Sequence, residues 1–389
     1  MLRWAFVLSL GISMLLTLPA HAVTSYSTMV GRLANLADRS SLIKLYDLGK
    51  SSSGDRSVWL TSVSDPSVDP RKTVRILILC RQHGDEPAST EAALEFLDHV
   101  ANGTAAGARD ALRHASLYIV PMVNPDGADL GTRENAKKVD LNRDWGHFNA
   151  AETSLVNKAC RSIRPAFVLD MHSWDQPDPF RSNCFEASRD AGAAASAERD
   201  LQRRAVDEIS DGTGQAISAT SYHSGIEDTL CHRYMTGWLE VPSLLFETAA
   251  GPSSGPGFDR RVGLARATIL WLLRDTAAHP DAWKHLVKVS ACDRIAPSLT
   301  FGAASTVAKA PAPPAAPHRR GFPVHILWAI AAYVVVAICV ARLRPVSREP
   351  GYIRIERVGE DEDGRPISRA VYVPSGEYKR HVLTRTGKR

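Results

Sequence analysis

Residues 74–100 read VRILILCRQHGDEPASTEAALEFLDHV, which predicts a buried β-strand, a turn and an amphipathic helix. Residues 74–79 are almost all apolar, as in a strand that is covered on both faces. Residues 89–100 carry apolar side chains at helical spacing, namely Ala92, Ala93, Phe96, Leu97 and Val100. His83 and Glu86 lie between the two elements, directly after the strand.

Further apolar runs extend this pattern along the chain. Strands are predicted at residues 116–120, 166–170 and 243–246, and a helix is predicted at residues 261–274. Strands that alternate with helices are typical of an α/β fold, which has a central sheet with helices on its faces.

Two polar clusters at strand ends offer metal ligands, at the edge where open α/β sheets place their sites. His83 and Glu86 are three residues apart in a turn, and a nitrogen with a carboxylate oxygen suits zinc. His172 follows the strand at 166–170 and would complete a set of three ligands, which leaves one zinc position open. Taken singly, each cluster also fits a surface turn or a packed histidine.

Two more clusters offer groups that act on a substrate. Arg133 and Arg143 follow the turn at residues 124–127, and a guanidinium can bind a carboxylate with two hydrogen bonds or stabilise an oxyanion. Glu247 ends the strand at 243–246, where a carboxylate could act as general base toward a zinc-activated water. The alternative interpretation, without a function, is that the arginines are solvated and the glutamate lies on the surface.

Six motifs occur in the order seen in the zinc metallocarboxypeptidases of the carboxypeptidase A type, which this chain resembles between residues 76 and 251. They are His-x-x-Glu at 83–86, Asn-Pro-Asp-Gly at 124–127, Arg-x-Asn at 133–135, Asp-Leu-Asn-Arg at 140–143, Asp-Met-His-Ser at 170–173 and Phe-Glu-Thr at 246–248. The resemblance implies a mixed, mostly parallel central sheet flanked by helices.

The resemblance also implies a role for each matching residue. His83, Glu86 and His172 correspond to the ligands of one zinc ion. Arg133 corresponds to the arginine that polarises the scissile carbonyl. Glu247 corresponds to the catalytic glutamate, which takes a proton from water and passes it to the leaving amine.

Substrate-binding residues follow in the same way. Asn142 and Arg143 correspond to the pair that holds the C-terminal carboxylate of the substrate. Tyr222 corresponds to the mobile tyrosine that closes over it, although Tyr222-His-Ser-Gly is one residue shorter than the family's Tyr-x-x-Ser-Gly. A second departure is Lys138, where the family often has glycine. The short spacing between motifs resembles that of bacterial enzymes that trim cell-wall peptides.

Both ends of the chain carry targeting signals in their sequence. Residues 1–22 have a basic start, an apolar stretch and Ala-His-Ala, which predicts a signal peptide; an uncleaved signal anchor is the alternative. Residues 23–295 form the expected catalytic domain, followed by an Ala/Pro-rich linker at 296–321. Residues 322–341 hold no Asp, Glu, Lys or Arg and predict a transmembrane helix. The expected protein is therefore membrane-anchored, with its catalytic domain in the periplasm or another extracytoplasmic space.

The basic tail at residues 342–389 is expected on the cytoplasmic side. It carries a charge excess equal to the net +5 of the whole chain, which is too small to indicate nucleic-acid binding. Two alternating stretches, at 352–355 and 370–374, flank an Asp-Gly turn and predict a hairpin, with an unstructured tail as the alternative. Of the six cysteines, Cys184 and Cys231 are one possible disulfide pair.

The sequence thus predicts a zinc metallocarboxypeptidase that acts on a peptide or a peptidoglycan-derived substrate. Two other functions fit the same residues. One is a zinc-dependent amidase or deacylase that acts on N-acyl amino acids, since those substrates also carry a carboxylate. The other is a zinc-binding module without catalytic activity.

Overall fold

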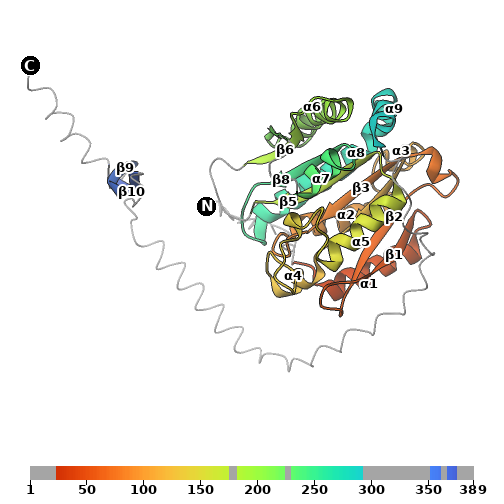
Figure 1. The fold of residues 1–389 in the computed structure, drawn as a ribbon, viewed down its shortest axis with the longest axis horizontal. Helices are drawn as coiled ribbons and strands as arrows, with labels where there is room; N and C mark the ends of the chain where they lie inside the picture. The colour runs from red at the N-terminus through yellow and green to blue at the C-terminus, as the bar shows by residue number, and fades with distance from the viewer. Residues whose placement is uncertain (1–22, 175–181, 224–228, 292–350, 361–365, 375–389) are drawn as a thin grey trace, which may run out of the picture. The chain divides into compact units, whose positions relative to one another are not determined.

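A computed structural model describes residues 23–174, 182–223, 229–291, 351–360 and 366–374 (Figure 1). The described residues up to 291 belong to one compact unit, and those from 351 onward belong to a second. Within these ranges no helix combines the length and apolar character needed to cross a membrane. The predicted span at residues 322–341 lies outside the described residues, as do residues 1–22.

The first unit alternates helices and strands along the chain (Figure 1). Its described strands are β1 (Ile43–Lys50), β2 (Ser57–Val63), β3 (Val74–Cys80), β4 (Ala115–Val120), β5 (Phe167–Ser173), β6 (Asn183–Ser188), β7 (Ile217–Tyr222) and β8 (Ser243–Thr248). Its described helices are α1 (Tyr26–Arg39), α2 (Ala88–Ala101), α3 (Ala108–Ala111), α4 (Pro125–Leu130), α5 (Ala151–Ile163), α6 (Ala193–Thr213), α7 (Cys231–Gly237), α8 (Gly255–Ala278) and α9 (Pro280–Val289). Short 3₁₀ turns, η1 (Pro70–Lys72) and η2 (Leu141–Arg143), complete the set.

The strands form one eight-stranded sheet in the order β1-β2-β4-β3-β5-β8-β6-β7. The centre, from β4 through β3 and β5 to β8, is parallel, and so is the pair of β6 with β7. The pairs β1–β2, β2–β4 and β6–β8 are antiparallel. The predicted α/β fold with a mixed central sheet is therefore confirmed.

Alternate side chains of the central strands build two separate cores, one on each face of the sheet. On β3, Ile76 and Ile78 pack into the first core, whereas Leu77 and Leu79 pack into the second. Helices α1, α2, α6, α8 and α9 contribute to the first core, and α5 and α7 contribute to the second. The central strands are buried on both faces, which explains why their sequences are apolar without alternation.

The strongly apolar elements match the sequence prediction, and the differences have local causes. Strand β5 continues through Ser173, so His172 lies within the strand and not after it. The predicted turn at 125–127 is the first turn of α4, because Pro125 at its start suits a helix N-terminus. Strands β6 and β7 were not predicted; polar residues interrupt both, and β7 exposes three of its side chains.

Two further predictions concern the tail and the cysteines. The hairpin prediction is confirmed by β9 (Gly351–Glu360) and β10 (Pro366–Pro374), which pair antiparallel; the residues of the turn lie outside the described part. The suggested pairing of Cys184 with Cys231 is wrong, because both thiols are buried and free. Cys184 lies opposite Glu247 on the sheet, whereas Cys231 is the first residue of α7 and packs in the second core.

Candidate metal centre

The loop after β3 is shaped by a close contact with the first turn of α4. A Cβ atom on Gly84 would lie 2.0 Å from the backbone carbon of Gly127, so only glycine fits at position 84. The Gly84 amide donates to the carbonyl of Arg133, and the Asn124 side-chain amide donates to that same carbonyl and to the Gln82 carbonyl. The Asn-Pro-Asp-Gly motif therefore packs against the His-x-x-Glu turn and fixes its position.

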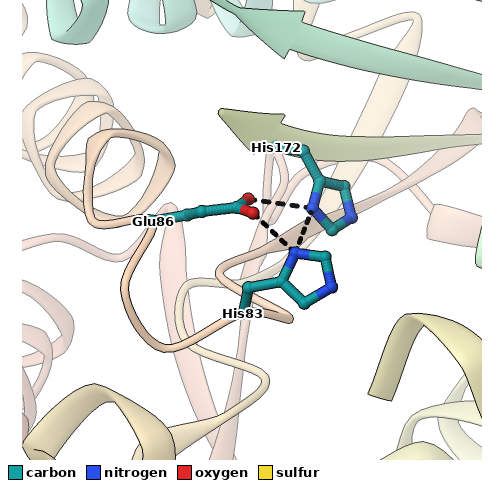
Figure 2. A group of neighbouring side chains, drawn as sticks. All are labelled: His83, Glu86 and His172. Carbon is teal, nitrogen blue, oxygen red and sulfur yellow. Dashed lines mark hydrogen bonds and ion pairs between the residues drawn. The ribbon is translucent and has the colours of Figure 1, made fainter. Parts of the chain in front are cut away.

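Three polar side chains converge where β3 and β5 end (Figure 2). His83 Nδ1 lies 2.6 Å from Glu86 Oε1, and His172 Nδ1 lies 2.9 Å from Glu86 Oε2. The two Nδ1 atoms are 3.1 Å apart, and all three side chains are buried. Two imidazole nitrogens and a carboxylate that face one another in the interior form a candidate metal site.

Two aspartates hold the outer nitrogens of the imidazole rings. Asp140 Oδ1 lies 3.1 Å from His83 Nε2, and Asp170 Oδ1 lies 3.1 Å from His172 Nε2. An acceptor on Nε2 favours the tautomer that carries its proton there, which leaves the Nδ1 lone pair for a metal. Asp170 and His172 are alternate residues of β5 and therefore share one face of the sheet.

The arrangement fits zinc in its spacing and in its chemistry. Ligand atoms around tetrahedral zinc are about 3.3 Å apart when the bonds are about 2.0–2.1 Å long. The three separations here, 2.6, 2.9 and 3.1 Å, approach that value without a rearrangement of the backbone. Three protein ligands also leave the fourth position open, as catalytic zinc sites do.

Charge effects among these groups are consistent with a cation in their midst. Burial opposes ionisation of Glu86, but His83 and His172 hold the pKa of that carboxyl far below its usual range. Burial likewise opposes protonation of His172, yet Asp170 and Glu86 raise its pKa well above the ordinary value. A positive charge on the imidazole rings thus stabilises the Glu86 carboxylate, as a bound metal ion would. Metal binding would displace the ring proton.

Glu247 stands beside this cluster because of strand register. In the parallel pair of β5 and β8, Glu247 lies directly opposite His172. Burial raises the pKa of Glu247 well above its usual range; Glu86 and Asp170 add to the rise, while His172 and Arg133 oppose it. Its Oε2 atom is buried with no hydrogen-bond partner among the described residues. A buried carboxylate oxygen of this kind is costly unless a cation, water or substrate reaches it.

The predicted substrate-binding residues reach the same place from the loop between α4 and α5. Arg133 lies 3.6 Å from Glu86 through Nη1 and donates from Nε to Asp140. Arg143 is exposed and donates from Nη1 to the carbonyl of Asn142. Lys138, where the family often has glycine, adopts a positive φ of 60°, the conformation that glycine adopts without strain.

Asn142 has partners that the sequence did not predict. Its Oδ1 accepts the backbone amide of Cys231 at the start of α7, and its Nδ2 lies 3.2 Å from His172 Nε2. Asn142 therefore holds the start of α7 and lies in contact with the ligand histidine, whose Nε2 proton is directed to Asp170. Its predicted contact with a substrate carboxylate stays a prediction.

Two members of the metal cluster, His83 and Glu86, border one cavity of about 300 Å³ together with Glu247 and both arginines. The described residues that line it are His83, Glu86, Arg133, Asn142, Arg143, Ser173, Trp174, Glu186, Leu230, Arg233, Leu245 and Glu247. Six of the eight residues that the sequence analysis singled out line this cavity, and a seventh, His172, contacts the cavity residues His83 and Glu86. The cavity combines a metal site, a buried carboxylate and guanidinium groups, which is the equipment for hydrolysis of a polarised carbonyl.

Tyr222 is the predicted residue that the structure sets apart from the cavity. It is buried at the end of β7, and its ring lies 5.2 Å from the His232 ring and 4.6 Å from the guanidinium carbon of Arg233. Glu186 and Arg233 line the cavity but were not predicted. The sequence carried no signal for either residue. Asp170, the acceptor for His172 Nε2, could have been found from the sequence, because its i, i+2 spacing to His172 places both side chains on one face of the strand.

Comparisons with known proteins identify a family that is described by its zinc-dependent activity, in agreement with the candidate metal site. The model of a family described as zinc carboxypeptidase matches residues 29–225, just over half of the chain. A zinc carboxypeptidase of Saccharothrix mutabilis subsp. capreolus is 31% identical over 129 residues, which is 29% of this chain and 29% of that protein. Carboxypeptidase SOL1 of Arabidopsis thaliana is 32% identical over 108 residues, which is 27% of this chain and 22% of that protein. The matches therefore span less than a third of these relatives.

Solved structures share the fold. A metallo-carboxypeptidase from Burkholderia cenocepacia superposes with a TM-score of 0.57 at 18% identity, covering 66% of this chain and 70% of that one. A metallo-carboxypeptidase from Pseudomonas aeruginosa gives a TM-score of 0.55 at 18% identity, covering 67% and 70%. Glu247 and Arg233 lie beyond the residues that the family model matches, so their place in the site comes from the structure.

Proposed function

Because the chain belongs to the zinc carboxypeptidase family, we propose that it is a metallocarboxypeptidase that hydrolyses the C-terminal bond of a peptide. One observation carries the proposal: the β5–β8 register sets Glu247 beside the His83–Glu86–His172 cluster, on a cavity that Arg133 and Arg143 also line. A general base, a metal site and two guanidinium groups thus share one space.

The residues divide the work of hydrolysis. His83, Glu86 and His172 would hold zinc, which when bound supplies Lewis acidity toward a water and toward the scissile carbonyl. Glu247 accepts a proton from the attacking water and delivers it to the leaving amine, for which its raised pKa suits it. Arg133 donates to the oxyanion that develops on the carbonyl.

The restriction to chain ends comes from the loop residues. Arg143 uses Nη1 to bond the Asn142 carbonyl, and its other N–H groups can bind a substrate. Its planar guanidinium can donate two parallel hydrogen bonds to a carboxylate. A peptide without a terminal carboxylate would not form this pair of hydrogen bonds with Arg143. Internal bonds are therefore poor substrates in this proposal.

The test is the variant Glu247→Ala, purified and loaded with zinc. We expect the variant to bind zinc as the wild type does, because Glu247 is not a ligand, and to lose turnover by at least about 10²-fold. Zinc content is measured by atomic absorption, and turnover is measured on a peptide with a free C-terminus and on its C-terminal amide. Full activity of Glu247→Ala would overturn the mechanism.

Two alternatives have their own outcomes in the same assay. Release of the acyl group from N-acyl amino acids, with peptides untouched, would identify an amidase or deacylase, and the arginines fit both substrates. Stoichiometric zinc without hydrolysis of any compound would identify a silent binding module. The family match and the presence of Glu247 in the site favour the carboxypeptidase.

We also propose that the enzyme works outside the cytoplasm on a membrane anchor. The support is the sequence: a signal-peptide pattern at 1–22, an Ala/Pro-rich linker at 296–321, an uncharged apolar segment at 322–341 and a basic tail at 342–389. Membrane fractionation with protease treatment of intact cells tests this. Recovery of the chain in the soluble fraction would contradict the anchor.

Cell-wall peptides are the proposed natural substrates, on the basis of location and of the short spacing between the site motifs. Incubation of the purified chain with muropeptides should release one amino acid from the peptide end. The mass of the shortened product identifies that residue. Muropeptides of unchanged mass, alongside cleavage of a synthetic peptide, would direct the search to other peptides.

A further inference from the structure

Two buried polar atoms near the metal cluster face each other without a hydrogen-bond partner among the described residues. They are Oδ2 of Asp170 on β5 and Nδ1 of His232 on α7, and they lie 3.9 Å apart. Both side chains are fully buried. Burying an unpartnered polar atom is unfavourable, so a pair of such atoms at one place calls for an explanation.

Asp170 connects this place to a metal ligand. Its Oδ1 lies 3.1 Å from Nε2 of His172 and accepts from Nε2 of Gln82 at 2.6 Å. Both contacts use the same oxygen, and the terminal torsion of an aspartate side chain has a broad minimum. The contacts of Oδ1 therefore leave the rotation of the carboxylate loosely defined, and a group that faces Oδ2 fixes it.

The imidazole of His232 lies between two carboxylates. Its Nε2 lies 2.8 Å from Oε1 of Glu186, and because an ionised carboxylate only accepts, Nε2 is the donor. Although burial opposes it, hydrogen bonds from His232 and Arg233 lower the pKa of Glu186 to about 2, so this partner is charged. Nδ1 faces the second carboxylate, that of Asp170. A proton on Nδ1 makes this second contact attractive, whereas a lone pair there would repel Oδ2.

Packing holds the His232 ring in this orientation. The Tyr222 ring meets it edge to face, with centroids 5.2 Å apart and an interplanar angle of 87°. Glu186, which holds the Nε2 end, borders the active-site cavity. The ring cannot turn away from Asp170 without breaking its bond to Glu186. A chain of contacts therefore runs from the cavity wall through His232 and Asp170 to the ligand His172.

We propose that His232 is a positioning residue of the metal centre, which fixes Asp170 through Nδ1 and thereby orients the zinc ligand His172. Outer residues that orient a ligand histidine raise metal affinity, because the ring is directed toward the metal before the metal binds. The inference rests on the zinc site that the proposed function uses. It is measured by zinc affinity and not by turnover, so its failure leaves the carboxypeptidase function standing.

Two substitutions separate the two ends of the ring. In His232→Asn the side-chain amide nitrogen takes the approximate place of Nδ1 and can still donate to Asp170. In His232→Gln it takes the approximate place of Nε2 and can donate only to Glu186. Zinc affinity of the purified full chain is measured by chelator competition. We expect His232→Gln to bind zinc about 10-fold more weakly than the wild type, and His232→Asn to stay within about threefold of it.

A double-mutant cycle tests whether the effect passes through Asp170. In the Asp170→Asn chain, His232→Gln should change zinc affinity by less than about twofold, because the group on which His232 acts is already altered. His99→Gln is the matched control, because both ring nitrogens of His99 also have partners, Thr104 at 2.8 Å and Arg266 at 2.8 Å, on a different part of the fold. It should bind zinc as the wild type does.

Each result decides the inference. Unchanged affinity in His232→Gln, or equal losses in His232→Gln and His232→Asn, overturns it, because a role in packing alone does not distinguish the two ends of the ring. Equal losses from His232→Gln with and without Asp170→Asn also overturn it. If His232→Gln fails to fold, Glu186→Ala takes its place, because it frees the Nε2 end of the ring. A loss of about threefold that disappears in the Asp170→Asn chain then supports the inference, and any other result refutes it.

Discussion

Glu198 offers a quantitative test of how the sheet is joined to its helices near the site. This residue of α6 is fully buried, and its Oε1 accepts the backbone amide of Ser188 on β6 at 2.7 Å. Its Oε2 accepts from Thr236 on α7 and from the amide of Ser243 at the start of β8. Burial raises the pKa of Glu198 to about 7, although these three hydrogen bonds act to lower it.

The raised pKa makes stability depend on pH in a defined direction. The folded chain binds the Glu198 proton more tightly than the unfolded chain, in which the pKa returns to about 4.5. The contribution is fully present below pH 4.5, falls as the pH rises, and is lost once the pH passes about 7. A rise from 4.5 to about 7, at about 1.4 kcal/mol for each pH unit, corresponds to about 3 kcal/mol.

The assay is urea unfolding of the full chain and of Glu198→Gln at pH 5 and pH 8, followed by tryptophan fluorescence. The glutamine side chain of the variant does not titrate, so its effect on the free energy of unfolding is the same at both pH values and cancels in the comparison. Between pH 5 and 8 the free energy of unfolding of the wild type should fall by about 2–3 kcal/mol relative to the variant. Glu95→Gln, which removes a carboxylate from a partly exposed pair, controls for the loss of one charge.

Parallel behaviour of the wild type and Glu198→Gln across this pH range would refute the reasoning. It would mean that Glu198 ionises in the folded state at its ordinary pKa. The three hydrogen bonds would then outweigh burial, and α6 would be held to the sheet by a charged group.

Three further predictions address the metal centre. His172→Ala should lose zinc at equimolar metal, measured by atomic absorption after gel filtration; retention of one zinc per chain would contradict its role as a ligand. Asp170→Asn should keep the fold and weaken zinc binding by about 10- to 100-fold in a chelator competition, because a neutral amide oxygen replaces the charged acceptor that orients His172; unchanged affinity would contradict this. Gly84→Ala should weaken zinc binding and lower the melting temperature, because a Cβ there would overlap the backbone of Gly127, whereas Gly31→Ala has open space around it and serves as control.

The sequence by itself determined the elements whose signals are local. Residues 74–80 form a strand because they are mostly apolar and are covered on both faces, and residues 88–101 form a helix whose apolar side chains are almost all buried. The turn between them had to carry His83 and Glu86 together, since only two residues of chain separate them. The order of six motifs then indicated the family, because each motif is a short local pattern.

The tertiary structure alone decided how distant segments meet. Glu247 faces the metal cluster because β8 pairs with β5 in a register that sets it opposite His172. Glu186 enters the cavity because β6 runs antiparallel to β8, and its neighbours His232 and Arg233 come from α7. Strand partner and register depend on packing across the whole sheet, which no local pattern encodes. The sequence therefore determined which groups do the chemistry, and the fold decided what surrounds the bond they act on.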